Sequence, residues 1–177
     1  MATTARSQST DFLTSHRFHV VDDGGALALN TPSAGFQSIV APDMTVSVVE
    51  YQEGTELYRR KFAGEIQFGT LTLTKGVAKS DSSFYKWLRA AAENKNYRVN
   101  LTIKQFHRDD VSGKINYAGT DVVPVRTYVC YNCIPTRVKV SSDFDAMSSE
   151  ISIEEIDVDM EYFRLFINGV EQTALDL

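Results

Sequence analysis

The sequence is poor in the residues that most catalytic and metal-binding sites require. Its 177 residues include two cysteines and three histidines. It contains no Gly-x-Ser-x-Gly nucleophile motif and no glycine-rich loop of the kind that holds phosphate. No apolar run approaches the roughly 20 residues that a membrane-spanning helix needs. The sequence therefore contains few residues that could form a catalytic site, and it does not predict a transmembrane helix.

The two cysteines form a C-x-x-C motif, Cys130 to Cys133. A zinc site needs four ligands, and the second pair could only be His16 and His19. These histidines lie in an expected strand, where residues three apart point to opposite faces. A thioredoxin-like role would need a helix starting at the motif, whereas a strand pattern follows it. We interpret Cys130 and Cys133 as reduced cysteines in a cytoplasmic fold, and we expect no metal and no cofactor.

Other titratable residues also favour structural explanations. His107 follows an expected strand and is interpreted as a surface residue. A group of acids, Glu154, Glu155, Asp157 and Asp159, could gather a hard cation. Strand alternation separates Glu154 from the other three, and calcium sites normally use a tight glycine-containing loop. We therefore expect an acidic strand face, and the net charge of −5 weighs against a nucleic-acid binder.

The overall composition is typical of a globular chain. Hydrophobic residues make up 43% of it and charged residues 23%. We expect one domain over residues 1–177, which would bury about 70% of its unfolded surface. Residues 1–16 are polar and are expected to form a flexible N-terminal arm. They lack the apolar stretch of a signal peptide, so we expect synthesis and folding in the cytoplasm.

Alternating apolar and polar residues predict many short strands. The cleanest pattern covers residues 97–104, and others occupy 16–21, 36–51, 66–73, 121–130, 134–140 and 149–160. Met44, Val46 and Val48 alternate with polar residues, which is typical of a strand with one wet face. Phase changes at Gly69 and at Glu154-Glu155 predict two β-bulges. The fold class is mainly β, an antiparallel sandwich or barrel with one packed α-helix.

The helix is predicted between residues 80 and 94. Ser80 or Asp81 can accept hydrogen bonds from the free N–H groups of its first turn. Its apolar face consists of Phe84, Trp87, Leu88 and Ala91. We expect this face to cover sheet, including the strand of Ile66, with Trp87 in the core. Asn94 tolerates the left-handed turn that ends a helix.

Residues 52–64 form an unusual connection between two of the strands. At about a dozen residues it is longer than most connections, and such loops are usually functional or disordered. Its large apolar groups argue against disorder. Its main residues are Glu53, Glu56, Leu57, Tyr58, Arg59, Arg60, Lys61 and Phe62. We interpret it as an inter-subunit loop, anchored by Tyr58 and Phe62; the alternative is a loop folded back on its own domain.

Charge is distributed unevenly along the chain. Residues 143–177 contain ten acids and one base, a net −9, and subtracting this from −5 leaves +4 on residues 1–142. A basic body and an acidic end can attract further copies head to tail. The simpler alternative is a solvated acidic face that keeps a monomer soluble.

The order of several motifs resembles a known family. Glu50-Tyr-x-Glu-Gly54, a basic cluster, a strand ending in Leu73-Thr-Lys-Gly76 and an aromatic-rich helix with Trp87 follow one another. This order resembles the tail tube proteins of contractile-tailed phages. It resembles even more the inner-tube proteins of extracellular contractile injection systems. The resemblance covers residues 18–158 and leaves 161–177 as a C-terminal extension without a counterpart.

The resemblance implies a tail-tube-like fold that oligomerises into hexameric rings, which stack into a hollow conduit. It implies a structural inner-tube subunit of a contractile injection particle, and not an enzyme. The implied partners are further copies of itself, sheath protein, baseplate proteins, and a lumenal cargo or tape-measure protein. Neither nucleic-acid specificity nor a stable membrane anchor is expected, and the particle would be cytoplasmic or released.

Three alternatives remain open from the sequence. One is the tube-initiating ring near the baseplate of the same particle. A second is a type VI secretion tube protein, which shares the architecture. From a different class, the chain could be a monomeric β-sandwich binding module.

Overall fold

The computed structural model describes residues 13–25, 27, 29, 35–106, 124–147 and 149–174. Within these residues it contains a single helix and ten strands. They are β1 (Phe18–Asp22), β2 (Phe36–Val40), β3 (Met44–Tyr51), β4 (Arg60–Phe68), β5 (Leu71–Gly76), α1 (Ser83–Ala92), β6 (Val99–Gln105), β7 (Arg126–Lys139), β8 (Ile153–Asp159), β9 (Tyr162–Ile167) and β10 (Val170–Glu171). The predicted mainly β fold with one helix is confirmed.

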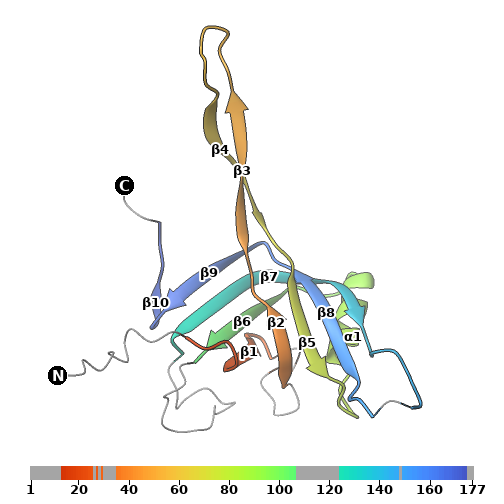
Figure 1. Cartoon of the computed structure of the whole chain (residues 1–177). Helices are drawn as coiled ribbons and strands as arrows, with labels where there is room; N and C mark the ends of the chain where they lie inside the picture. The colour runs from red at the N-terminus through yellow and green to blue at the C-terminus, as the bar shows by residue number, and fades with distance from the viewer. Residues whose placement is uncertain are drawn as a thin grey trace, which may run out of the picture.

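The body of the molecule is an antiparallel sheet, from which a separate two-stranded ribbon projects (Figure 1). The order of strands in the sheet is β1-β6-β7-β8-β5-β2. The long strand β7 joins its two parts, since residues 126–133 pair with β6 and residues 134–139 pair with β8. The projecting ribbon consists of β3 and β4, which pair only with each other among the described strands.

The core lies on the inner face of this sheet. Its buried side chains come from five strands, the helix and the turn after β1, and include Val20, Leu29, Leu71, Leu73, Phe84, Trp87, Leu101, Ile103, Cys130, Cys133, Ile156 and Val158. This pattern follows from strand alternation, because every second residue of β5 and β8 points inward.

The helix closes one side of this core. Phe84 and Trp87 are buried, whereas Leu88 and Ala91 are half-buried. The Trp87 indole Nε1–H donates to the Tyr97 carbonyl at 2.5 Å, which satisfies the polar end of a buried ring. The expectation that α1 covers the strand of Ile66 was wrong. The helix contacts β7, and Ile66 lies in the projecting ribbon.

The end of the helix agrees with the sequence, but the predicted cap residue was wrong. Ser82 occupies the cap position instead of Ser80 or Asp81, although the Asp81 carboxylate accepts from the Ser83 N–H at 2.9 Å. Asn94 follows the helix with a φ of 52°, the left-handed conformation that asparagine tolerates.

Both predicted bulges were misplaced. Pairing between β5 and β8 runs without a shift from Leu71–Val158 to Gly76–Ile153. The phase change at Glu154 arises because this acid occupies an inward position. At Gly69 the chain leaves the ribbon, and a Cβ there would lie 1.7 Å from Asp43 Oδ1, so the close approach requires glycine.

Both termini of the described chain join the sheet. Of the predicted N-terminal arm, residues 13–16 lie within the described part, and the Thr14 carbonyl accepts from Gln105 Nε2 at 3.1 Å. The C-terminal extension contributes β9, which pairs along β7, and β10, which pairs with β9. The rings of Tyr131 on β7 and Tyr162 on β9 stack on each other with centroids 4.6 Å apart.

A buried ion cluster explains the inward acid. Lys75 is fully buried, and its Nζ lies 2.5 Å from Asp81 Oδ2 and 3.1 Å from Glu154 Oε1. Burial raises the pKa of Glu154 above its ordinary value, although Lys75 opposes this. Burial acts the same way on Asp81, but hydrogen bonds from Lys75 and Ser83 outweigh it, so the pKa of Asp81 is lowered. The cluster ties the start of α1 to β5 and β8.

Lys75→Met is expected to destabilise the fold by about 3–5 kcal/mol, because it leaves the buried Glu154 and the half-buried Asp81 without their cation. Chemical denaturation followed by the fluorescence of the buried Trp87 measures the change. Lys95→Met is the matched control, since Lys95 is exposed and its ion pair is with the exposed Glu93 on the surface. We expect that change to stay within about 0.5 kcal/mol. Equal stabilities of the two variants would contradict a structural role for the cluster.

Candidate assembly surface

The β3–β4 ribbon stands away from the body with water on both of its faces (Figure 1). Residues 52–59 connect its two strands. The predicted loop of residues 52–64 is therefore shorter than expected, because Arg60 to Gly64 belong to β4. Lys61 pairs with Glu50, and Phe62 pairs with Val49, which extends the ladder outward. Since neither strand has a second neighbour in the described chain, both outer edges of the ribbon are open.

Large apolar side chains are exposed along the whole ribbon. Met44, Val46, Val48, Val49, Tyr51, Phe62 and Ile66 have exposed fractions between 46% and 60%. At the tip, Leu57 is 91% exposed and Tyr58 is 83% exposed. The expectation that β3 has one wet face was wrong, since every residue of that strand is exposed. Exposed apolar surface of this extent is unusual on a soluble monomer, which makes the ribbon the candidate assembly surface.

The charged residues of the tip pair with one another. Arg59 Nη1 lies 3.0 Å from Glu50 Oε2, and Lys61 Nζ lies 3.7 Å from Glu50 Oε1. Arg60 Nε donates to Glu56 at 3.0 Å, and this hydrogen bond raises the pKa of Arg60. Glu53 contributes its carbonyl, which accepts from the Glu56 N–H at 3.0 Å. These pairs are exposed and stabilise the ribbon only weakly, so they orient the tip rather than hold it together.

Sequence reasoning missed the apolar residues of β3 as part of this surface. The signal was present, because Val48 and Val49 are adjacent and Tyr51 follows in the opposite phase to Met44 and Val46. A strand that is apolar in both phases has no wet face reserved for solvent. Such a strand either is buried on both faces by its own chain or needs another chain to cover one of its faces.

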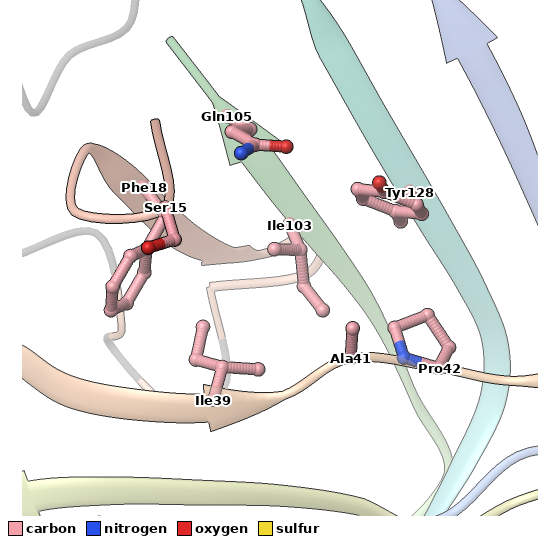
Figure 2. A pocket seen from close by; sticks show the side chains of 8 residues that line it. All are labelled: Ser15, Phe18, Ile39, Ala41, Pro42, Ile103, Gln105 and Tyr128. Carbon is pink, nitrogen blue, oxygen red and sulfur yellow. The ribbon is translucent and has the colours of Figure 1, made fainter. Parts of the chain in front are cut away.

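A second open feature lies where the sheet fails to close. Strands β1 and β2 are the two ends of the strand order and do not pair with each other. Between them lies a cavity of about 160 Å³. Its lining, shown in Figure 2, includes Phe18, Ile39, Pro42, Ile103 and Tyr128. The seam is mainly apolar, and within the described residues each of these two strands pairs along one edge only.

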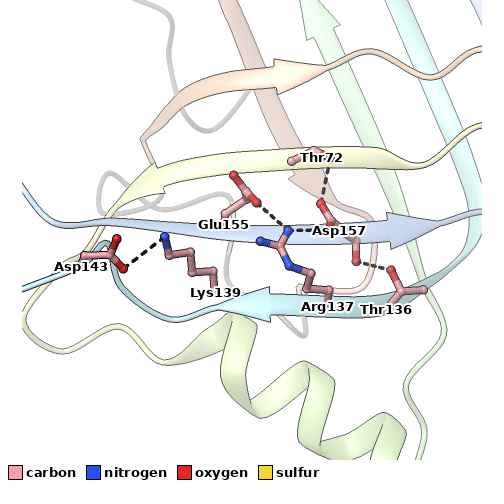
Figure 3. Close-up of polar contacts among 7 residues, drawn as sticks. All are labelled: Thr72, Thr136, Arg137, Lys139, Asp143, Glu155 and Asp157. Carbon is pink, nitrogen blue, oxygen red and sulfur yellow. Dashed lines mark hydrogen bonds and ion pairs between the residues drawn. The ribbon is translucent and has the colours of Figure 1, made fainter.

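The outer face of β7 and β8 is polar, and its charged and hydroxyl groups form ion pairs and hydrogen bonds with one another (Figure 3). Arg137 Nη1 lies 2.7 Å from Glu155 Oε1 and 2.8 Å from Asp157 Oδ2. The Thr72 hydroxyl donates to Asp157 at 2.9 Å, and the Thr70 hydroxyl donates to Asp159 at 2.7 Å. The predicted acidic strand face is confirmed. Among the residues that the structure describes, no group of three or more potential ligands could hold a metal.

Cys130 and Cys133 are both buried free cysteines. They share the inner face because Asn132, with a φ of 52°, forms a bulge between them, and its N–H donates to Asn100 Oδ1 at 2.9 Å. A hydrogen bond with Cys133, reinforced by burial, raises the pKa of the Cys130 thiol, so the reactive thiolate is disfavoured. His16 is exposed and His19 is buried, so they do not form a pair of ligands. His107 lies outside the described residues.

Comparison with known proteins agrees with this architecture. The family model described as T4-like virus tail tube protein gp19 matches residues 14–164. The chain belongs to this family. It is a structural tube subunit with a mainly β fold. No curated protein matches it.

Solved structures show the same fold over nearly the whole chain. A chain of the PVC extracellular contractile injection system, from the sheath-tube complex in its extended state, is 23% identical with a TM-score of 0.71. The alignment covers 92% of this chain and 99% of that one. A chain of the anti-feeding prophage cap is 25% identical with a TM-score of 0.68, covering 94% and 99%.

The anti-feeding prophage baseplate, determined with sixfold symmetry, also contains a similar chain. That chain is 20% identical with a TM-score of 0.69, and the alignment covers 91% of this chain and 99% of that one.

Within the described part of this protein, no helix combines the length and hydropathy that crossing a bilayer requires.

The outer polar face predicts a pH-dependent contribution to stability. A hydrogen bond from Arg137 lowers the pKa of Asp157. The stabilisation is therefore complete above the unfolded-state pKa of about 3.9, and it is lost as the pH falls through the lower folded-state pKa. Asp157→Asn should cost about 1 kcal/mol at pH 7 and nearly nothing at the acid end.

Denaturant titrations of the wild type and the variant at several pH values measure this difference. Asp143→Asn is the control, because Asp143 is fully exposed and lies 3.6 Å from Lys139, so its effect should be small at every pH. A wild-type advantage over Asp157→Asn that stays constant across the acid range would contradict the assignment.

Proposed function

We propose that this chain forms hexameric rings that stack into the hollow inner tube of a contractile, phage-tail-like injection particle. The observation that carries the proposal is the β3–β4 ribbon, which exposes apolar side chains on both faces and has no third strand at either edge among the described strands. Membership of the tail tube family supports it. The sixfold symmetry of the similar baseplate structure supports the ring number.

The ribbon is an unfavourable structure for an isolated subunit. A lone two-stranded hairpin is marginally stable in water, and it usually needs a third strand or an apolar cover. Open edges also promote association with other strands. Identical copies can supply both the missing strand and the cover. Assembly into a tube therefore stabilises the part of the chain that the monomer leaves incomplete.

The seam between β1 and β2 provides a second element that a neighbour can complete. Its apolar lining and unpaired edges sit on the body, away from the ribbon tip (Figures 1 and 2). Pairing between edge strands of adjacent copies would join their sheets side by side. We propose that this contact contributes to closing a ring, while the ribbon reaches further.

The proposed mechanism is mechanical and needs no catalytic residue. Stacked rings form a stiff conduit, which a contracting sheath drives through a membrane. Sheath protein would contact the outside of the tube, baseplate proteins its end, and a cargo or tape-measure protein its lumen. We propose synthesis in the cytoplasm, followed by assembly into a particle that is kept there or released.

Reversing the tip charges tests the role of the ribbon in assembly. The triple variant Arg59→Glu, Arg60→Glu and Lys61→Glu places like charges beside Glu50 and Glu56 and should reorient the tip. We expect a folded subunit that forms no tubes, because the core lies away from the tip. Circular dichroism checks the fold, and negative-stain electron microscopy checks assembly.

The matched control reverses three lysines near the helix, Lys79→Glu, Lys86→Glu and Lys95→Glu, which are all exposed. It makes the same change in net charge and should still form tubes. If the tip variant forms normal tubes, the tip is not part of the assembly surface.

A tube-initiating ring at the baseplate is the second candidate, because a chain of the anti-feeding prophage baseplate is similar to this one. Copy number separates the two functions. The main tube subunit should be among the most abundant proteins of the particle, whereas an initiating ring would contribute a single ring of copies. Quantitative mass spectrometry of purified particles measures this ratio.

A further inference from the structure

Three ionisable side chains meet in the core, where neither the fold nor the tube proposal uses their chemistry. Lys75 on β5 is fully buried, which is rare for a lysine. Glu154 is its direct cross-strand partner on β8, and this side chain is 6% exposed. Asp81, just before α1, reaches the same lysine. An amine and two carboxyl groups therefore share one site inside the protein.

The lysine nitrogen contacts the two acids in different ways. Lys75 Nζ donates a hydrogen bond to Asp81 Oδ2 at 2.5 Å. It also lies 3.1 Å from Glu154 Oε1, but without the angles of a hydrogen bond. That oxygen is buried and has no hydrogen-bond partner among the residues that the structure describes. The carboxyl carbon of Glu154 is one bond away, so the amine is close to the separation of about 3–3.5 Å from which attack on carbon begins.

The two acids also differ in protonation. Burial raises the pKa of Glu154, against the opposing effect of Lys75, which favours the neutral carboxylic acid. Burial acts in the same direction on Asp81, but hydrogen bonds from Lys75 and Ser83 outweigh it and lower the pKa of Asp81, which favours the carboxylate. A neutral carboxyl group can be attacked by an amine, and a carboxylate can accept a proton. Two acids whose environments separate their pKa values in this way can take opposite roles in one reaction.

The surroundings of the site keep water out. The Phe84 ring lies over Lys75 Nζ, with its centroid 4.1 Å away. Leu73 and Ile156, each two residues from the pair on its own strand, are fully buried. Condensation of an amine with an acid releases water, so bulk water opposes the reaction and a dry core favours it. Well-oriented groups also reach effective concentrations of about 10⁵–10⁸ M, which two free molecules never do.

We propose that Lys75 and Glu154 condense in the folded chain to an isopeptide bond, with Asp81 as the general base. The Asp81 carboxylate takes one proton from Lys75 Nζ, and the nitrogen lone pair attacks Cδ of the protonated Glu154. The Nζ–Cδ bond forms and one Cδ–O bond breaks. The departing hydroxyl takes a second proton from Nζ and leaves as water. Asp81, whose side chain is 17% exposed, returns its proton to solvent, and no oxidant or cofactor is consumed.

The bond would tie together two neighbouring strands that lie far apart in the sequence. Residues 76–153 separate the two partners and include α1, β6 and β7. A cross-link that closes a loop of this length removes much of the conformational freedom of the unfolded chain. The ion cluster is the reactant of this step. The inference concerns the isolated subunit and is independent of assembly, so it stands or falls separately from the proposed tube function.

Mass spectrometry of the purified wild-type chain tests the proposal. The protein is incubated folded for several days, sampled at intervals and denatured before its intact mass is measured. We expect the mass to fall about 18 Da below that of the sequence, because one water is lost. Trypsin cannot cleave after an acylated Lys75, so digestion should give a branched peptide that joins residues 62–79 to residues 140–164. Fragmentation of that peptide locates the bond.

Variants assign the roles of the three residues. Lys75→Arg and Glu154→Met each remove one reacting group and should keep the full mass. Asp81→Asn keeps both reacting groups and should slow the loss of mass by about 10²-fold, the usual effect of removing a general base. The controls change the nearest equivalents outside the site: Lys79→Arg on the surface and Glu155→Met on the outer face of β8. Both controls should lose water as the wild type does.

The opposite results are equally clear. A wild-type chain that keeps its full mass throughout the incubation overturns the proposal. A loss of about 18 Da that persists in Lys75→Arg comes from another dehydration and also overturns it. If Asp81→Asn reacts as fast as the wild type, Asp81 is not the base. Circular dichroism checks that the variants fold, and if one of them does not, the presence or absence of the branched peptide in the wild type decides.

Discussion

The main constraint on this protein is the β3–β4 ribbon, an antiparallel strand pair that projects from the body into solvent. Backbone N–H and C=O groups along both outer edges, together with apolar side chains on both faces, have no partner within the ribbon. The described part of the subunit does not bury them, because the body lies at only one end of the ribbon. We propose that further copies of the chain bury them, and membership of the tail tube family supports this proposal.

The well-packed body holds the base of this ribbon in a fixed position. Its core is continuous across the sheet and the helix, and the buried Lys75 links α1 to two strands. The chain enters the ribbon after Pro42 and leaves it at Gly69, where the Asp43 carbonyl accepts the Gly69 N–H at 3.2 Å. This contact closes the base of the hairpin, so the direction of the ribbon is coupled to the sheet beneath it.

The sequence predicted the parts of the fold that depend on local pattern. The helix was identified because four apolar residues, Phe84 to Ala91, recur with helical spacing. The strand at residues 97–104 alternated cleanly, and it is β6 in the structure. The inward direction of Glu154 was not predicted, because its cation, Lys75, is brought to it only by pairing between β5 and β8. The β-bulge of the ribbon, where Ser47 stands opposite both Gly64 and Glu65, was also missed, since Ser47 lies across the hairpin from them.

The candidate surface was found only in part for the same reason. The charges and aromatic groups of residues 53–62 are local, and an unusual composition marked them. The first apolar residues of β3 alternate like those of an ordinary strand with one buried face, and the change of phase at Val49 indicates only that both faces need cover. The tertiary position of the ribbon shows that the described part of the chain does not supply this cover. A pattern of apolar residues indicates burial, but it does not say whether the cover is supplied by the same chain or by another.

Hydrogen–deuterium exchange of the ribbon amides, compared between dilute subunits and assembled protein, tests the central claim most directly. We expect fast exchange of the outward N–H groups of β3 and β4 in the dilute subunit and strong protection after assembly. The amides of β6 and β7, already paired within the body, should change little. Equal exchange of the ribbon amides in both states would contradict the claim that other copies complete it.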